Sequence, residues 1–217
     1  MKHVSLSNNI TFVFNRSVYD DFGTQEVEEK IKTVYSGQDP EVGSTSFPNE
    51  IKAVFSTNLQ IQIVGQGKTV IIADTKINEA NEISSTDTAR LALSIYKLML
   101  EKALVGRMFG FNFIFSYQDV AFDAVQNKIK AKYFKSDLNI EDAEIKFALP
   151  NISYEIGTAR YTLKFDIEPD EDGVPSKVSV ACNVHFANIE DLSDDTFVDV
   201  YKQSYKHVYE ALGEIND

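Results

Sequence analysis

The sequence predicts an α+β fold made of two units, each an antiparallel β-sheet followed by a long helix. Two observations support this fold class. Apolar and polar residues alternate in short segments within residues 50–77 and again within residues 144–189, which is the period of β-strands. Each set of segments is followed by a stretch with apolar residues at helical spacing, at residues 84–104 and 192–212.

The composition is that of a globular protein and limits the function classes. The chain is 43% hydrophobic and 25% charged. Its single cysteine, Cys182, excludes an intrachain disulfide, which favours a cytoplasmic location. The N-terminus lacks the apolar run of a signal peptide, and no window approaches the roughly 18 uncharged apolar residues of a membrane span. We therefore expect no membrane partner.

The chain divides into three regions. Residues 1–49 contain a strand at 9–15, a helix at 24–35 and a loop rich in Gly, Pro and Ser at 37–49. Residues 50–135 form the first sheet-and-helix unit. Residues 136–217 form the second unit, which is acidic.

The first unit is expected to begin with three strands in a meander. Its segment LQIQIV alternates cleanly, so one face of that strand should be wet. Ser85 or Thr86 can cap the helix that follows. FGFNFIFSY, residues 109–117, is the strongest strand in the chain, and a further helix is expected at residues 120–134. The buried side of the first long helix is expected to comprise Leu91, Ala92, Ile95, Leu98, Met99 and Ala103.

The second unit repeats this order. Strands are expected in EIKFALPN, ISYEIGTARYTLKFDIE and SKVSVACNVHFANI, with the acidic loop EPDEDGVPSK between the last two. Asp194 or Asp195 is expected to cap the final helix. The buried side of that helix is expected to comprise Val198, Tyr201, Tyr205, Val208 and Leu212.

The two units match at a separation of 108 positions. Over residues 69–104 this gives 8 identities in 36 positions, among them Val70 with Val178 and Leu104 with Leu212. Upstream, EIK at Glu50 matches EIK at Glu144, so an insertion is needed, which we place in the acidic loop. One interpretation is an internal duplication with pseudo-twofold symmetry. The other is that capping chemistry and helix composition produce the coincidences.

Strands followed by a long helix, in an acidic chain, resemble the SecB-like fold. The arrangement is also similar to a larger bacterial family that carries two such units in one chain. The resemblance covers roughly residues 50–212 and rests on element order, acidity and the terminal helix, so no functional residue is carried across. SecB itself departs from this pattern because it has one unit per chain and a further C-terminal helix. The resemblance implies binding of polypeptides.

The net charge of −12 lies entirely in the second unit. Residues 1–136 hold 15 Lys/Arg and 15 Asp/Glu, whereas residues 137–217 hold 6 and 18. The chain shows no basic stripe, so a nucleic-acid partner is not expected. An acidic surface either keeps a protein soluble or attracts a basic partner. For the second case the candidate partner-binding residues are Glu168, Asp170, Glu171 and Asp172.

Tests for metal and cofactor motifs lead to no predicted site. The segment EPDEDG resembles the front half of a calcium loop, but the twelfth position is Ser179 instead of Glu and the flanks are strands. GQGKT, residues 65–69, lacks the upstream glycine of a phosphate loop and joins two strands. We expect a solvated hairpin tip at the acidic loop and no cofactor.

The remaining candidate side chains each allow a structural and a functional interpretation. Cys182 and His185 lie three apart on a strand and therefore on opposite faces, which does not suit a ligand pair or a nucleophile with its base. His207 is either a surface residue or lines a pocket with Tyr201, Tyr205 and Tyr209. A local run of lysines either stabilises the C-terminal end of the expected helix through the helix dipole or contacts an anionic partner. That run comprises Lys128, Lys130, Lys132 and Lys135.

These features predict a non-catalytic, cytoplasmic protein-binding module that is chaperone- or adaptor-like and has a protein or polypeptide partner. A homo-oligomer is compatible with the sequence. One alternative is an acidic inhibitor or decoy of a basic protein in a phage or mobile-element conflict. The other alternative is a small-molecule-binding protein or enzyme with a pocket between the two units, for which His207 and the nearby tyrosines are candidates.

Overall fold

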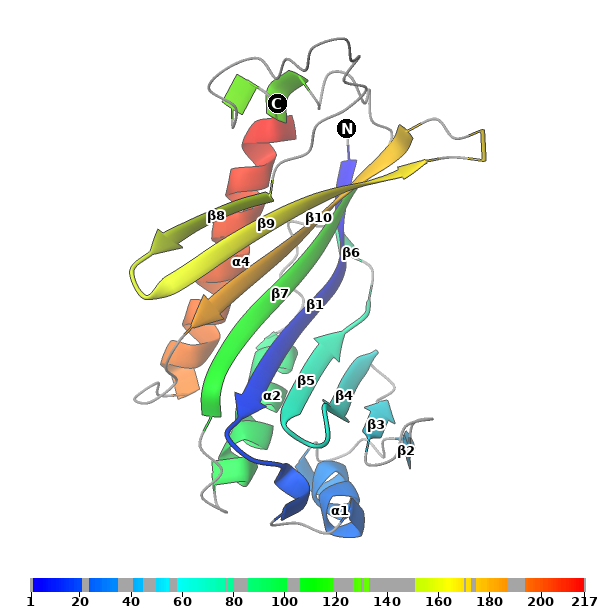
Figure 1. Ribbon diagram of the computed structural model, residues 1–217, viewed down its shortest axis with the longest axis vertical. Coiled ribbons are helices and arrows are strands. Elements are labelled where there is room, and N and C mark those ends of the chain that lie inside the picture. The colour runs from blue at the N-terminus through cyan, green and yellow to red at the C-terminus, as the bar shows by residue number, and fades with distance from the viewer. Residues whose placement is uncertain are drawn as a thin grey trace, which may run out of the picture.

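Ten antiparallel strands form one twisted sheet, and helices α2 and α4 lie behind it in Figure 1. The fold is therefore mixed α and β with an antiparallel sheet, as predicted. The computed structural model describes residues 2–20, 24–34, 41–44, 50–54, 58–76, 78–79, 86–100, 106–118, 127–129, 131–132, 151–169, 171–172, 175–186 and 194–216. The strands are β1 Lys2–Phe14, β2 Glu41–Ser44, β3 Ile51–Val54, β4 Leu59–Val64, β5 Thr69–Asp74, β6 Asn78–Glu79, β7 Gly106–Gln118, β8 Asn151–Ile156, β9 Ala159–Pro169 and β10 Pro175–Phe186. The helices are η1 Val18–Asp20, α1 Thr24–Val34, α2 Thr86–Leu100 and α4 Asp194–Asn216.

The strands of both predicted units belong to this one sheet, which corrects the expectation of two sheets. The order is β2-β3-β4-β5-β1-β7-β10-β9-β8, with the short strand β6 beside β1. The central strands β1 and β7 pair from Lys2 opposite Gln118 to Phe14 opposite Gly106. Joining the units edge to edge satisfies backbone groups that two separate sheets would leave unpaired.

The N-terminal region supplies the central strand. β1 begins at Lys2, well before the predicted start at Asn9, and an irregularity between Ser5 and Ser7 interrupts its register with β7. Such a bulge increases the local twist of a strand. The predicted loop at residues 37–49 also contains a short strand, β2, which pairs with β3.

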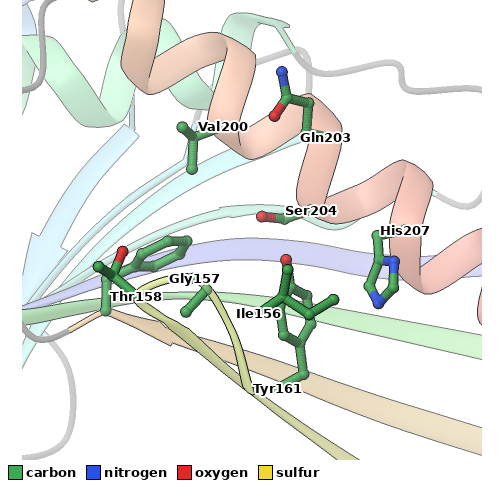
Figure 2. Close-up of a pocket in the computed structure, with 10 residues that line it drawn as sticks. Ile156, Gly157, Thr158, Tyr161, Val200, Gln203, Ser204 and His207 are labelled. Atoms are coloured by element: carbon green, nitrogen blue, oxygen red, sulfur yellow. The ribbon is translucent and has the colours of Figure 1, made fainter. Parts of the chain in front are cut away.

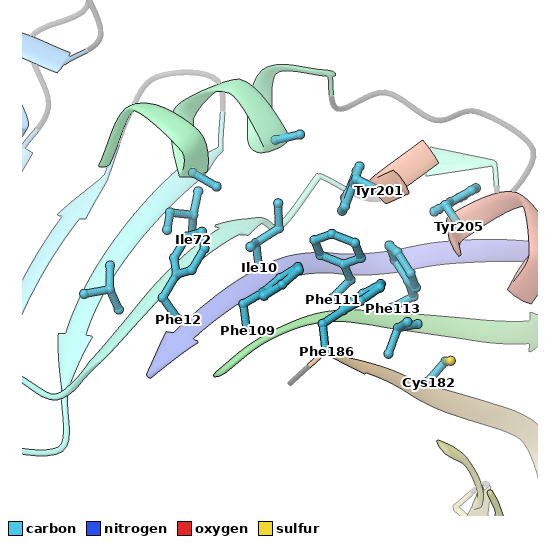
Figure 3. Packing of buried hydrophobic residues seen from close by; sticks show 14 of the residues in the cluster. Ile10, Phe12, Ile72, Phe109, Phe111, Phe113, Cys182, Phe186, Tyr201 and Tyr205 are labelled. Atoms are coloured by element: carbon cyan, nitrogen blue, oxygen red, sulfur yellow. The ribbon is translucent and has the colours of Figure 1, made fainter. Parts of the chain in front are cut away.

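The core lies between the sheet and the helices, and aromatic side chains dominate it (Figure 3). Alternate residues of β7 point to the helices, so Phe111 meets Tyr201 edge-on at 5.1 Å between ring centroids. Phe113 meets Tyr205 in the same way at 5.3 Å. Edge-to-face aromatic pairs add to the stabilisation from burial. The predicted alternation of LQIQIV is confirmed in β4, whose residues are buried and half-buried in turn.

The helices begin at the predicted positions, Thr86 and Asp194, but their buried sides differ in part from the prediction. On α4, Phe197 is fully buried and Val198 only half-buried, because the face set by Tyr201 and Tyr205 continues through position 197. The other predicted residues of α4 are buried: Tyr201, Tyr205, Val208 and Leu212. On α2 the buried residues include Leu91, Ala92, Ile95 and Tyr96, and Leu98 is half-buried.

Two predicted elements fall mostly outside the described residues. Of the helix expected at residues 120–134, residues 127–129 and 131–132 are described and are helical, with Ile129 fully buried. Of the expected strand EIKFALPN, Asn151 is described as the first residue of β8.

Candidate functional site

A cavity of about 370 Å³ lies between the turn of hairpin β8–β9 and one side of helix α4 (Figure 2). We call it the hairpin pocket. It is in the second unit, not between the two units as the small-molecule alternative expects. Its lining residues are Ile156, Gly157, Thr158, Ala159, Tyr161, Phe186, Val200, Gln203, Ser204 and His207.

The floor of the hairpin pocket comes from a two-residue turn. Ile156 pairs with Ala159, and Gly157 and Thr158 form the connection. Gly157 has φ of +60°, a conformation that glycine adopts at little cost. This tight turn sets the register that places Tyr154 opposite Tyr161, and both rings contact His207 of α4.

The wall of the hairpin pocket is one face of α4. Val200, Gln203, Ser204 and His207 lie at helical spacing and point to one side of the helix. The neighbouring face carries Tyr201 and Tyr205 into the core, so the helix is fixed against the sheet while its other side borders the pocket. Ser204 is 2% exposed.

Three side chains join the hairpin to the helix beside the cavity. The Tyr154 hydroxyl lies 3.1 Å from Nε2 of His207, at hydrogen-bond distance. The rings of Tyr154 and Tyr161 are parallel, with centroids 5.2 Å apart. The His207 ring meets the face of Tyr161 at 4.9 Å and an angle of 67°. Together they form an aromatic end wall.

The lining of the hairpin pocket mixes apolar and neutral polar groups. No Asp, Glu, Lys or Arg is among its lining residues. Polar groups come from Thr158, Gln203, Ser204 and His207, and the rest of the lining is aliphatic, aromatic or glycine. A concave site in which apolar walls meet a few polar side chains is the usual form of a small-ligand site. The arrangement can hold an uncharged group and orient it, and it offers no carboxylate for acid–base chemistry.

The hairpin pocket adjoins an end of the sheet. Among the described strands none pairs with the outer edge of β8, which is the last strand in the order. β8 contains neither Lys nor Pro and has no register shift against β9; its one charged residue, Glu155, forms an ion pair with Arg160 of β9. Ile156, at the end of β8, is 47% exposed although it is a large apolar residue.

The sheet face turned away from α2 and α4 carries a row of amides. Asn9, Asn112 and Asn183 lie opposite one another on β1, β7 and β10. The Asn112 amide donates to Oδ1 of Asn9 at 2.7 Å, and the Asn183 amide donates to Oδ1 of Asn112. The row continues on β9 and β8, where the hydroxyls of Thr162 and Ser153 are 3.0 Å apart. These bonds link β1 to β7, β7 to β10 and β8 to β9, and they leave this face polar.

The predicted partner-binding acids lie at the far hairpin, β9–β10, away from the hairpin pocket. Glu168 is at the end of β9 and forms an ion pair with Lys177, Nζ to Oε2 at 2.6 Å. Glu171 and Asp172 are exposed in the turn. Asp170 lies outside the described residues. In the described part of the chain, no three His, Cys, Asp or Glu side chains group as a metal site requires.

The other sequence candidates are placed as follows. Cys182 is buried and His185 half-exposed, on opposite faces of β10 as expected. In the GQGKT turn the amides of Gly67 and Lys68 already donate to Val64 and Gly65 carbonyls, so they are not free to hold a phosphate.

The basic run is only partly described. Lys128 is half-buried and Lys132 is exposed. Lys130 and Lys135 lie outside the described residues.

The prediction for His207 needs correction in its partners. His207 does line a pocket, but Tyr201 and Tyr205 face the core instead. The tyrosines beside it are Tyr154 and Tyr161, which the sequence analysis did not single out. The segment ISYEIGTARY could have predicted this pair, because a two-residue turn at Gly157 and Thr158 places Tyr154 and Tyr161 opposite each other.

Comparison with known proteins adds no relative. No family model matches the chain, and no curated protein matches it significantly. Among the described helices, none is both long enough and apolar enough to cross a bilayer.

Proposed function

We propose that the chain is a non-catalytic, cytoplasmic polypeptide-binding module, chaperone- or adaptor-like, whose binding site is the outer edge of β8 together with the hairpin pocket. The observation that carries this proposal is their adjacency at Ile156, which ends the edge strand and lines the pocket. The outer edge of β8, with which no described strand pairs, offers backbone N–H and C=O groups to an extended segment. A neighbouring pocket offers room for one of its side chains.

We further propose that the fold arose by internal duplication, which fits the SecB-like resemblance with two units in one chain. The strand order supports this, because β3-β4-β5 and β8-β9-β10 flank the central pair β1–β7 in mirrored order. Each unit would then begin with its central strand, β1 or β7, and end with its long helix, α2 or α4.

The pairing register supports the same axis. Asp74 and Cys182 are counterparts at the separation of 108 positions. Asp74 pairs with Asn8, and Cys182 pairs with Phe113, so Asn8 and Phe113 are also counterparts. These two residues pair with each other. A residue that pairs with its own counterpart lies on a twofold axis, so the axis would pass through this pair.

A third match falls outside the segment that defined the separation. Leu59 pairs with Asp74, and Leu163 pairs with Cys182, so two leucines become counterparts. On this alignment the turn at residues 65–68 corresponds to residues 169–176. The acidic hairpin would therefore hold only part of the insertion that the EIK match requires.

The proposed binding function is tested with a client that stays unfolded at neutral pH, such as reduced and carboxymethylated lactalbumin. The purified protein is mixed with the client and analysed by size-exclusion chromatography at low and high salt. We expect co-elution that persists in high salt, because backbone pairing and apolar burial are weakly screened. Absence of co-elution at both salt concentrations would contradict the function.

The same experiment addresses the acidic-inhibitor alternative, which the exposed Glu171 and Asp172 favour. A folded basic protein replaces the unfolded client. The inhibitor function would be favoured over polypeptide binding if the chain bound the basic protein but not the unfolded client. That binding should be lost at high salt and weakened by the double substitution Glu171→Gln and Asp172→Asn. We expect instead that the wild type binds the unfolded client, and that the two substitutions do not change this binding.

A further inference from the structure

We propose that the hairpin pocket receives an uncharged aromatic side chain with one hydrogen-bonding group, that of tyrosine or tryptophan, from an extended segment paired with β8. This inference rests on the proposed polypeptide-binding function and specifies its ligand. Four properties of the described residues lead to it: the size of the cavity, its aromatic walls, its lack of charge and its position at the sheet edge.

The size of the cavity selects a single ring system. Ligand pockets range from about 300 to 1,000 Å³. The hairpin pocket, at about 370 Å³, is at the small end of this range. It suits one amino-acid side chain or one small ring compound better than an extended cofactor.

The walls select an aromatic group. Tyr161 and Phe186 line the cavity, and the ring of Tyr154 stacks on that of Tyr161. His207 holds its ring at 67° to Tyr161, which leaves an aromatic corner (Figure 2). A further ring can join such a corner in an offset-stacked or edge-to-face arrangement.

The polar groups select a neutral ligand with one donor or acceptor. A cationic side chain would lose its hydration without meeting an opposite charge, because the lining contains no carboxylate; a carboxylate could meet a charge only at His207, whose Nε2 already lies at hydrogen-bond distance from Tyr154. The side chains of Thr158, Gln203 and Ser204 offer neutral donors and acceptors instead. A phenol hydroxyl or an indole N–H can be satisfied there, whereas an ammonium group finds no anion in the lining.

The position favours a polypeptide over a free ring compound. Alternate residues of an edge strand direct their backbone groups away from the sheet, and an added strand satisfies them. Ile156 belongs to both β8 and the hairpin pocket, so a segment that pairs with β8 passes the mouth of the cavity. Its side chains alternate in direction, which lets one residue enter while its neighbours stay outside.

The test uses three blocked pentapeptides, acetyl-Thr-Val-Xaa-Val-Thr-amide with Xaa as Tyr, Ala or Glu, and the free compound p-cresol. Binding to the full chain is followed by amide and imidazole NMR shifts. We expect the Tyr peptide to shift residues 151–161, residues 200–207 and the His207 ring. We expect it to bind at least tenfold more tightly than the Ala and Glu peptides and than p-cresol.

Two variants locate the site. Ser204→Leu fills the cavity and should weaken the Tyr peptide at least tenfold. Ser94→Leu, on the exposed side of α2, is the matched control and should leave binding unchanged. Shift mapping on the wild-type chain keeps the test decisive if Ser204→Leu does not fold. Equal binding of the Tyr and Ala peptides, or shifts confined to other residues, would overturn the inference. Tighter binding of p-cresol than of the Tyr peptide would overturn its polypeptide part.

Failure of this inference is distinguishable from failure of the proposed function. If the unfolded client co-elutes equally with the wild type and with Ser204→Leu, the pocket assignment is wrong and the function stands. If the Tyr peptide occupies the hairpin pocket but no unfolded client co-elutes, the chaperone-like function is wrong and the pocket assignment stands.

Discussion

The Tyr154 hydroxyl and the Nε2 atom of His207 lie 3.1 Å apart and join the edge strand β8 to helix α4. Their positions in the sequence are far apart, so this contact exists only in the folded chain. It fixes one end of the hairpin pocket, since His207 also lines the cavity.

We expect Tyr154→Phe to lower the free energy of unfolding by about 1 kcal/mol, because a partly buried hydrogen bond contributes roughly that amount. Urea unfolding measures the change. Tyr161→Phe is the control, since it keeps the stacked ring, and we expect a change below about 0.5 kcal/mol. A double-mutant cycle with His207→Leu should give a coupling energy of about 1 kcal/mol. A coupling near zero would mean that the bond does not stabilise the fold.

Gly67 is expected to tolerate no side chain. Its φ is +80°, and an added Cβ would collide with Ser17 and with the ring of Tyr19. Gly67→Ala should therefore destabilise the protein by at least about 2 kcal/mol, as the sum of backbone strain and steric overlap. Gly157→Ala is the matched control, because φ is +60° there but nothing lies within 4 Å. It should cost about 1 kcal/mol, and equal losses at the two positions would refute the role of the collision.

The amide row predicts that its middle member matters most. The side chain of Asn112 bonds to Asn9, Thr11 and Asn183, whereas within this row Asn183 bonds to Asn112. We expect Asn112→Ala to lower the free energy of unfolding by about 1–2 kcal/mol and Asn183→Ala by less than about 1 kcal/mol. Thermal unfolding of the two variants compares them. A larger loss of stability for Asn183→Ala than for Asn112→Ala would contradict this prediction.

Because the thiol of Cys182 is buried, we expect the free energy of unfolding to fall in alkaline solution. Burial raises the pKa of its thiol from 9.0 to about 12, because the thiolate cannot be solvated inside the core. Above pH 9 the unfolded chain releases this proton and the folded chain keeps it, so the free energy of unfolding falls as the pH rises. At pH 10 the loss from this group is about 1.4 kcal/mol relative to pH 7.

The measurement compares unfolding of the wild type and Cys182→Ala from pH 7 to pH 10. The difference between the two proteins isolates the thiol from the tyrosines and lysines that titrate in the same range. We expect Cys182→Ala to be less stable at pH 7 through the lost packing, with the gap narrowing as the pH rises. A gap that is constant with pH would contradict the buried thiol.

Local patterns predicted the elements but not how the units join. The alternation of LQIQIV and the starts of the two long helices at Thr86 and Asp194 follow from neighbouring residues, and the sequence displays these patterns directly. The pairing of Asn9 with Asn112 depends on two strands far apart in the chain. Periodicity states which face of each strand is buried, and it does not state which strand lies beside it.

The candidate site shows the same limit. The sequence points to His207 because histidine is chemically distinctive, and to Tyr201 and Tyr205 as its partners because they share its helix. The structure turns those tyrosines to the core and brings Tyr154 and Tyr161 from the hairpin. Residues on one helix diverge by 100° at each step, so sequence neighbours of a site residue often face elsewhere.

The central place of β1 bears on how the protein is made. A ribosome completes Phe12 long before Phe109, its partner on β7, and at about 5–20 residues per second the interval is roughly 5–20 s. Throughout that time one long edge of β1 has no partner strand from β7. The emerging first half is thus an open template for other nascent chains, and translation speed between these two strands becomes a determinant of yield.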